Sequence, residues 1–345
     1  MLQNIVVLAG GVGGARFTRG LVAELEARHP DPATRPDVTA VVNTGDDAWV
    51  AGLRITPDLD SMMYTLAGRN DEERGWGLRD ESYRVSAELS AYGVGWPWFT
   101  LGDLDLGTHI ARSAMLRDGL SHTQVVERLT ARWNDGLGPP VRLLPMSDSP
   151  IETHVEIDLG SGPELVHFEE WWVKHRASVP AQRFVQVGLP GASATWQVRD
   201  ALSAASLILI APSNPVVSIG TILAVPGVRA AIDASGAPVV GVSPIIGGAV
   251  VRGMADACLT AIGVETSAAA VAAHYGARSA AFAGSGALRP GLLSGWLVGE
   301  EDAALVPGVE ALGIRTRAVP LWMTDVAASA ALAGTALDLG AQLAE

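Results

Sequence analysis

The chain has 345 residues, 48% of them apolar and 18% charged, and its formal net charge is −13. This composition supports a large buried core, while the negative charge disfavours nucleic acid and anionic membranes as partners. The single cysteine excludes an intramolecular disulfide, and neither a secretory leader nor a membrane-spanning run is evident. We therefore expect a cytoplasmic protein that acts on small molecules.

Alternating strand and helix patterns run along most of the chain. A strand is predicted over 4–9, a helix over 14–28 and a second strand over 38–43. Residues 60–145 have mainly helical patterns, and short alternating strands follow between 150 and 190. The strand–helix pattern then returns, with strands over 207–210, 238–242 and 315–318 and helices over 216–224, 252–262, 265–275 and 325–343.

This pattern predicts an α/β fold with a doubly wound, mainly parallel, Rossmann-like sheet. Residues 1–60 and 191–345 would form the nucleotide-binding core, and 61–190 a mostly helical insertion that caps it. Ligands of such sheets bind at the carboxyl ends of the strands, where the glycine-rich and polar turns of this chain are expected to meet.

The most informative motif follows the first strand: Gly10, Gly11, Gly13 and Gly14, with Arg16 close behind. The Gly-Lys-Ser/Thr of a Walker A loop is absent, and Arg16 stands where a dinucleotide fingerprint needs Gly or Ala. Glycines before a helix N-terminus favour a phosphate-binding loop of another type, and Arg16 could also contact the bound phosphate. A tight turn without a ligand remains the alternative.

Four carboxylates follow the second strand, at Asp46, Asp47, Asp58 and Asp60. Oxygen ligands without His or Cys suit Mg²⁺, which often binds one or two carboxylates together with substrate phosphate. We favour Asp46 and Asp60 as metal ligands and catalytic residues. For Asp47 and Asp58, a role in a turn or a helix cap is an equal alternative.

A second polar turn contains Ser213, Asn214 and Ser218, with Pro215 predicted at the first helical position. Together with the first glycine loop, it suggests a diphosphate held between two helix ends. Arg252, after a third strand, could bind the same phosphates or lie on a solvated helix end.

Aromatic residues begin the stretch Trp98-Phe-Thr-Leu-Gly-Asp-Leu-Asp-Leu-Gly-Thr-His109. Aromatic groups beside polar ones suit a flat heteroaromatic ring, although such clusters more often belong to a core. The motif of a serine-nucleophile elbow is absent, and Cys258 has the helical apolar neighbours of a packing residue.

In this order the motifs resemble one family, the transferase that completes the coenzyme F-420 precursor (2-phospho-L-lactate transferase, called phosphoenolpyruvate transferase in actinobacteria). The resemblance covers nearly the whole chain. Its matching stretches include 10–16, 43–49, 57–60, 101–109, 144–148, 167–172, 212–219 and 243–247.

The resemblance implies that a guanosine-diphosphate-linked enolpyruvate or lactate is the donor and that the deazaflavin Fo is the acceptor. The ribityl hydroxyl of Fo would attack the phosphorus that carries the three-carbon acid, GMP would leave, and Mg²⁺ would be required. Asp46 and Asp60 would hold the metal, and Asp60 is the candidate base. The donor residues would be Gly10, Gly11, Gly13, Gly14, Arg16, Ser213, Asn214, Ser218 and Arg252. The acceptor residues would be Asp60, Gly102, Asp103, Leu104, Thr108 and His109.

One departure from the family pattern concerns the acceptor, because relatives commonly carry a basic residue where this chain has Leu104. The composition and the Trp171-Trp172 pair favour an actinobacterial type, and hence enolpyruvate. A homodimer is expected. The remaining alternatives are a nucleotide-sugar-like or NAD-dependent enzyme and a non-catalytic regulator of the cell envelope that binds a nucleotide-linked sugar.

Overall fold

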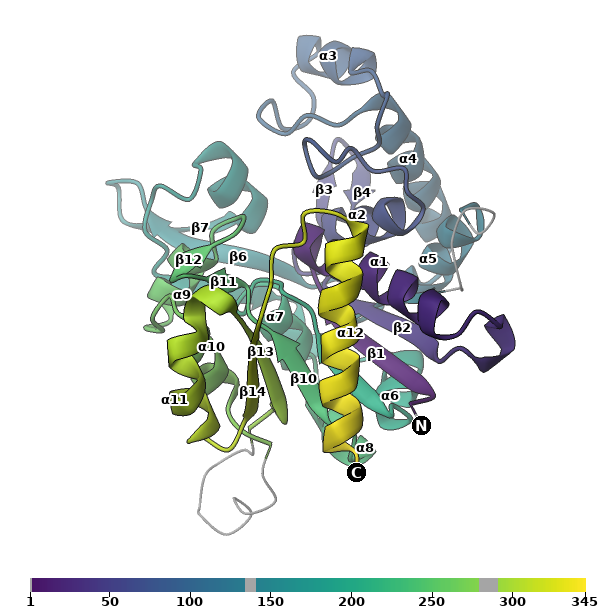
Figure 1. The fold of residues 1–345 in the computed structure, drawn as a ribbon. Helices are drawn as coiled ribbons and strands as arrows, with labels where there is room; N and C mark the ends of the chain where they lie inside the picture. Colours follow the sequence, from purple (N-terminus) through teal and green to yellow (C-terminus); the bar gives the residue numbers. More distant parts are fainter. Residues whose placement is uncertain (1, 134–140, 279–290) are drawn as a thin grey trace.

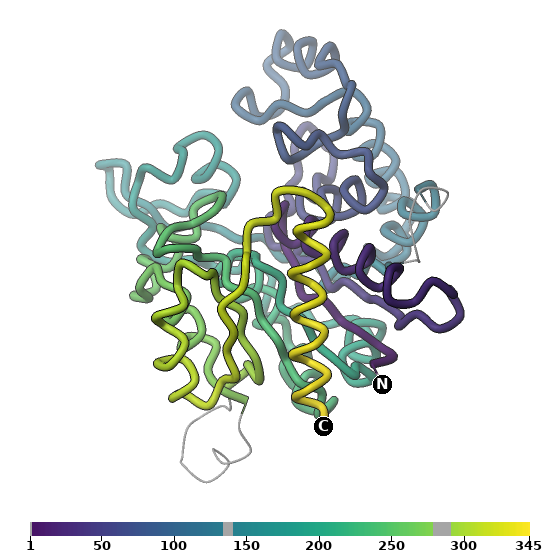
Figure 2. The backbone as a smooth tube through the Cα atoms, viewed as in Figure 1, coloured from purple at the N-terminus to yellow at the C-terminus, as the bar shows by residue number. Residues whose placement is uncertain are grey.

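The computed structural model describes residues 2–133, 141–278 and 291–345. Its centre is a parallel sheet of seven strands in the order β14-β13-β10-β9-β1-β2-β5, with helices on both faces (Figures 1 and 2). These strands are β1 (Asn4–Ala9), β2 (Asp37–Val42), β5 (Val141–Pro145), β9 (Leu207–Ile210), β10 (Val239–Val242), β13 (Gly295–Gly299) and β14 (Arg315–Val319). The predicted α/β fold with a mainly parallel sheet is confirmed.

Alternate residues of the central strands bury two separate cores. In β1, Ile5 and Val7 pack on the face covered by α1 (Gly11–Arg28), α2 (Pro57–Leu66) and α12 (Val326–Leu343). Val6 and Leu8 pack on the other face. That face is covered by α6 (Trp196–Ser203), α7 (Ile219–Ala224), α8 (Val228–Ser235), α9 (Ala255–Ala261), α10 (Ala268–Tyr275) and α11 (Val306–Glu310). Strands buried on both faces account for the continuous apolar runs in the sequence.

Helix α12 is long and apolar enough to cross a membrane by length and composition alone. In this structure it packs along α1, and the backbone of Ser329 approaches Gly20 so closely that a Cβ on Gly20 would lie 2.4 Å from the Ser329 carbonyl carbon. Its apolar side thus forms part of the core.

A cap stands above the carboxyl edge of the sheet, at the top of Figure 1. It begins with the hairpin of β3 (Ala48–Val50) and β4 (Leu53–Ile55) and continues through α3 (Arg84–Ala91), α4 (Asp103–Arg117) and α5 (His122–Ala131). The chain then enters the central sheet as β5 and forms an antiparallel sheet of β6 (Glu152–Asp158), β7 (Pro163–His167) and β8 (Arg183–Val187). A π-helical turn over Glu170–Lys174 follows β7. A small hairpin, β11 (Ile245–Ile246) with β12 (Ala249–Val250), lies after β10.

Several local expectations need correction. Helix α1 begins at Gly11, not 14, so the glycines form its first turn, and α7 begins at Ile219, not 216. Strand β13 was not predicted. The range 61–190 is not wholly outside the core, because β5 pairs with β2 in the central sheet. Residues 134–140, in the range predicted to be mainly helical, lie outside the described residues.

Candidate active site

The loops after β1 and β9 are joined at the carboxyl edge of the sheet. The Ser213 hydroxyl accepts a hydrogen bond from the Gly10 N–H at 3.0 Å and donates one to the Gly10 carbonyl at 2.7 Å. Ser213 therefore holds two predicted phosphate loops against each other, and Gly10 uses both of its backbone groups in this contact.

The first glycines lie where other parts of the chain come very close. A Cβ on Gly10 would lie 2.7 Å from both Asp58 Oδ2 and Ser218 Cβ, and one on Gly13 would lie 2.5 Å from the Pro212 carbonyl oxygen. These contacts exclude larger residues whether or not a phosphate binds. The proposed phosphate role of the loop stays a prediction.

A carboxylate already faces the N-terminus of α1. Asp58 accepts hydrogen bonds from the Gly11 N–H and from Asn43 Nδ2, the latter at 2.9 Å. Burial raises the pKa of Asp58 to about 6, although both hydrogen bonds act to lower it. Asp58 thus links the β1 and β2 loops, a contact that the sequence alone left open.

Asp46 and Glu169 are buried beside Asp58 and, with it, form the sheet-edge acids. Their exposed fractions are 7% for Asp46 and 3% for Glu169. Burial, then Asp58 and Glu169, raise the pKa of Asp46 well above its ordinary value. Burial and Asp58 raise the pKa of Glu169 to about 8. The cluster therefore holds more negative charge than its surroundings stabilise.

The sheet-edge acids have the chemistry of a magnesium site. Asp46 Oδ1 is buried and has no hydrogen-bond partner among the described residues. An unpaired buried carboxylate oxygen is costly unless a cation binds it, and Mg²⁺ favours oxygen ligands of this type. Asp46 can therefore offer an oxygen to a divalent cation, while the group of described residues whose ligand atoms all lie within 4.8 Å of one another is Asp60, Asp105 and His109.

Glu169 was missed by sequence reasoning, although it lies inside the matched stretch 167–172. It comes directly after β7, more than 120 residues beyond Asp46 in the chain. The sequence feature that could have identified Glu169 is its position just after a predicted strand. This feature is weak evidence in the region 150–190, where several short strands are predicted.

Asp60 lies in a second group, the cap network, between α2 and α4. Its Oδ1 accepts a hydrogen bond from Arg112 Nη2, and its Oδ2 accepts one from the Thr56 hydroxyl at 3.2 Å. His109 Nδ1 lies 3.6 Å from Asp60 Oδ2, while His109 Nε2 lies 3.4 Å from Asp105 Oδ2. The two predicted metal ligands, Asp46 and Asp60, thus belong to different groups.

Asp47 lies between these groups. Burial raises its pKa well above the ordinary value, while Arg54 and Arg112 lower it and the charges of Asp60 and Asp58 raise it further. Its Oδ2 is 3.5 Å from Arg54 Nη2. The sheet-edge acids and the cap network are therefore electrostatic neighbours.

Apart from Asp60 on α2, the predicted acceptor residues lie at the start of α4, but they differ in burial. Gly102 is the N-cap of the helix, and Thr108 and His109 are buried in the cap network. Leu104 is 52% exposed and, with Asp103, lines a cavity of about 250 Å³ that also includes Arg69, Arg79, Leu78, Gly107, Arg132 and Trp133. The structure does not bring the whole set into one pocket.

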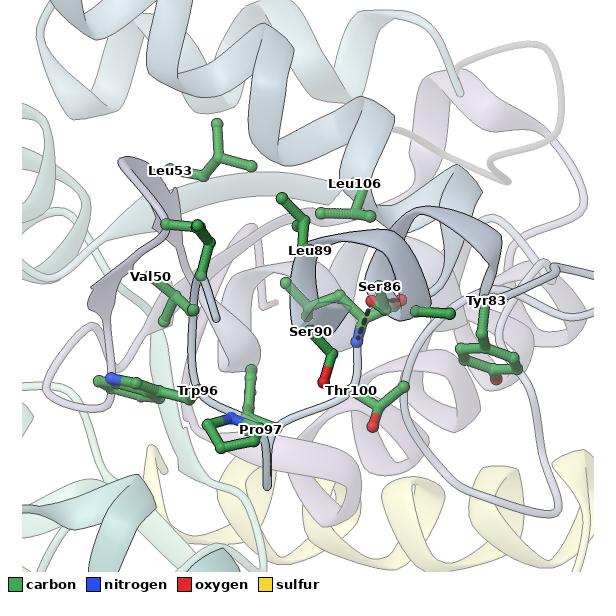
Figure 3. A pocket seen from close by; sticks show the side chains of 16 residues that line it. Val50, Leu53, Tyr83, Ser86, Leu89, Ser90, Trp96, Pro97, Thr100 and Leu106 are labelled. Atoms are coloured by element: carbon green, nitrogen blue, oxygen red, sulfur yellow. Dashed lines mark hydrogen bonds between the residues drawn. The ribbon is translucent and has the colours of Figure 1, made fainter. Parts of the chain in front are cut away.

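A second cavity of about 240 Å³ is lined mainly by apolar and aromatic side chains (Figure 3). It lies between the β3–β4 hairpin, α3 and the loop that carries Trp96 and Phe99. The Trp96 ring stacks on Trp98 with centroids 4.7 Å apart and is 5.6 Å from the His167 ring. His167 Nε2 is in turn 3.3 Å from the Asp47 carbonyl oxygen. This aromatic pocket therefore borders the acidic edge of the sheet.

Two predicted donor residues, Arg16 and Arg252, lie near each other. Burial, and then the charge of Arg16, lower the pKa of Arg252. Arg252 also lies over the Trp76 ring at 5.6 Å and donates to the Arg74 carbonyl. Two neighbouring cations at an acidic edge suit an anionic ligand.

Asn214 was predicted to cap a helix that begins at Pro215; it instead caps a turn, and the helix begins at Ile219 with Ser218 as its N-cap. Asn214 Oδ1 accepts hydrogen bonds from Val216 N at 2.9 Å and Val217 N at 3.2 Å, while its Nδ2 lies 3.4 Å from Cys258 Sγ. Ser218 is buried at the N-cap of α7. Whether these residues contact a nucleotide stays a prediction.

Known proteins resemble this chain over nearly its full length. A family model described as 2-phospho-L-lactate transferase CofD matches residues 5–301. A phosphoenolpyruvate transferase of Streptomyces griseus is 54% identical over 341 residues and covers 99% of both chains. Proteins of the same name from Thermobifida fusca and Mycobacterium avium are each 51% identical, with 99% and 98% of both chains covered.

A solved structure supports the fold. The UPF0052 family protein of Bacillus halodurans matches with a TM-score of 0.59 and 17% identity, over 98% of this chain and 99% of that chain. At this identity the likeness concerns the fold alone.

Proposed function

Because the chain belongs to the 2-phospho-L-lactate transferase (CofD) family, we propose that it transfers a phosphoenolpyruvyl group to the deazaflavin Fo. The observation that carries this proposal is the similarity to phosphoenolpyruvate transferases, 54% identical over 99% of the chain. The donor would be a guanosine-diphosphate-linked enolpyruvate, with the 2-phospholactyl donor as the alternative.

In the proposed reaction the ribityl hydroxyl oxygen of Fo forms a bond to the phosphorus that carries the three-carbon acid. The bond from this phosphorus to the oxygen shared with GMP breaks, and GMP leaves with the electron pair. The hydroxyl proton passes to a base, for which Asp60 is the candidate. Such a transfer depends on alignment and charge neutralisation and requires no covalent intermediate.

The donor phosphates would lie at the carboxyl edge of the sheet. Arg16 and Arg252 would supply neighbouring positive charge there, and the Asn214 turn would be the second donor loop. Arg252 would exchange its contact with the Arg74 carbonyl for a phosphate oxygen, a stronger, charge-assisted bond.

Asp46, Asp58 and Glu169 are suited to hold Mg²⁺, and Asp60 remains a proposed ligand from the second group. When bound, Mg²⁺ would neutralise phosphate charge as it develops in the transition state. Without a cation, the negative sheet-edge acids would repel the negative phosphates of the donor. A cation bound between them would be attracted by both.

The deazaflavin ring fits the aromatic pocket of Figure 3 in chemistry, because its walls are apolar and its rim contains Ser86, Ser90 and Thr100. Trp96 extends from this pocket toward His167 and the acidic edge. A ring bound here would direct its ribityl chain toward the cap network. Substitution of Trp96 by Ala should therefore weaken Fo binding in a fluorescence titration and leave GDP binding unchanged.

Mass spectrometry of the product formed from Fo with each of the two donors tests the proposal. An Fo adduct carrying enolpyruvyl phosphate, together with one equivalent of GMP, is the expected result. A lactyl adduct alone would change the donor, and the absence of any adduct and of any Fo-induced spectral change would favour the non-catalytic regulator.

A further inference from the structure

Arg112 is buried at the centre of the cap network, with 1% of its surface exposed. It donates from Nη2 to Asp60 Oδ1 and from Nη1 to the Arg54 carbonyl at 3.3 Å, and its Nη1 lies 2.9 Å from His109 Nδ1. Burial alone would lower the pKa of Arg112, but the nearby Asp60 carboxylate raises it above its ordinary value. A charged guanidinium thus binds residues of α2, α4 and β4 together.

The contact between Arg112 and His109 determines which hydrogen-bonding role the Nδ1 atom of the imidazole takes. A guanidinium has five N–H donors and no acceptor, so at 2.9 Å His109 Nδ1 must be the acceptor. The other ring nitrogen, Nε2, lies 3.4 Å from Asp105 Oδ2 and has no hydrogen-bond partner among the described residues. Tyr64 donates to the other oxygen of Asp105 at 2.8 Å.

We infer that Arg112 is a positioning residue for the transfer reaction: it holds the Asp60 carboxylate in one orientation and fixes the His109 ring by donating to its Nδ1. The effect of Arg112 on catalysis rests on the proposed function. The hydrogen bond from Arg112 to His109 Nδ1 rests on the geometry alone. Neither Asp60 Oδ1 nor His109 Nδ1 is free in this arrangement. Asp60 Oδ2, which accepts the longer hydrogen bond from Thr56 at 3.2 Å, is the oxygen not held by Arg112.

A shift of about 1 Å in a catalytic group can cost roughly 10²-fold in rate. Replacing the planar two-pronged guanidinium by the single ammonium of lysine keeps the charge but cannot bridge Asp60 and His109 in the same way.

The first test measures the ¹⁵N chemical shifts of the His109 ring by NMR in the full-length protein. The expected result is an unprotonated Nδ1, with its assignment made by comparison with His109→Gln. A proton on Nδ1 in the wild-type protein would overturn the inference, whatever the enzymatic activity, because Nδ1 could then not accept from Arg112.

The second test compares Arg112→Lys with Arg183→Lys, a matched control on the exposed strand β8. Arg112→Lys should lower kcat by roughly 10- to 100-fold and leave the GDP affinity within about twofold, because the donor residues lie elsewhere. Equal losses in kcat and GDP affinity would indicate a purely structural role, and an unchanged kcat would contradict the inference.

A charge-neutral pair keeps the test decisive if Arg112→Lys folds poorly. In Asp60→Asn with Arg112→Gln, the ion pair is removed as a whole, so the double variant should regain part of the melting temperature that Asp60→Asn loses, without regaining kcat; Asp47 and Asp105 still lose the Arg112 charge. A double variant with wild-type kcat would contradict the inference. If the wild-type protein forms no Fo adduct, the proposed function fails while the NMR measurement of His109 Nδ1 still stands.

Discussion

The two groups of buried acids at the carboxyl edge of the sheet differ in what compensates their charge. In the cap network, Asp60 is paired with Arg112 and hydrogen-bonded to Thr56. Among the sheet-edge acids, Asp46 and Glu169 lie beside Asp58, and Asp46 Oδ1 has no partner within the described part of the chain.

This difference separates a group whose charge is paired within the protein from a group whose charge is not. Buried charges are stable when they are paired and costly when they are not. The cap network satisfies most of its own charge and can hold its shape before substrate binds. The sheet-edge acids are stabilised most by binding a cation or a proton, so their contribution to protein stability should change with metal concentration and pH.

The largest expected effect comes from removing the metal. EDTA should lower the transfer rate by roughly 10³-fold or more, since a bound cation contributes several kcal/mol to charge stabilisation in such sites. Added Mg²⁺ should restore the rate. Mg²⁺ alone should also raise the melting temperature of the wild-type protein but not that of Asp46→Asn; equal shifts would place the cation elsewhere.

Neutralising one acid from each group should give opposite effects on stability. Both Asp60→Asn and Asp46→Asn should lower kcat by roughly 10²-fold. Asp60→Asn leaves the Arg112 charge buried without its partner and should cost about 3 kcal/mol of unfolding free energy, whereas metal-free Asp46→Asn should gain stability.

Chemical denaturation at pH 7 measures both effects, with the exposed Asp200→Asn on α6 as the control. Loss of stability in both variants would show that the Asp46 charge is compensated in a way that the structure does not display.

The metal-free protein should lose stability as the pH rises. Glu169 has its pKa raised to about 8 from an ordinary value near 4.5, so the folded state binds a proton that the unfolded state has released between these values. Stability should therefore be highest below about pH 4.5 for this group and fall by roughly 4 kcal/mol by pH 8.

Glu169→Gln should flatten this dependence, and so should saturating Mg²⁺, since the cation replaces the proton. The measurement is the unfolding free energy from urea titrations at a series of pH values between 5 and 9. A wild-type slope that persists in Glu169→Gln would assign the proton to another group, of which Asp58, with its pKa raised to about 6, is the nearest.

The smallest expected effect concerns the donor turn. Asn214→Ala removes hydrogen bonds to Val216 N and Val217 N and should cost about 1 kcal/mol of stability as a lost cap. If the turn also binds the donor, GDP affinity measured well below the melting temperature should fall. An unchanged affinity would limit Asn214 to the cap.

Much of the fold was predictable because its signals are local. The apolar runs of β1 and β9, the glycines after β1 and the helical periodicity of α12 each lie within a few adjacent residues, and the strand–helix alternation indicated the parallel sheet. Strand β13 was missed because its five residues, Gly295–Gly299, begin and end with glycine and contain little β-branched sequence.

The sequence by itself determined which chemical groups gather at the carboxyl edge: glycines, serines, aspartates and two arginines that follow successive strands. Only the tertiary structure decided how they are partnered. Burial and long-range contacts placed Glu169 beside Asp58 and joined Arg112 to Asp60 across 52 residues. Pairing and desolvation depend on neighbours in space, so the spacing of acids along the chain could not distinguish Asp46, which has an unpartnered oxygen, from Asp60, which is held by an arginine.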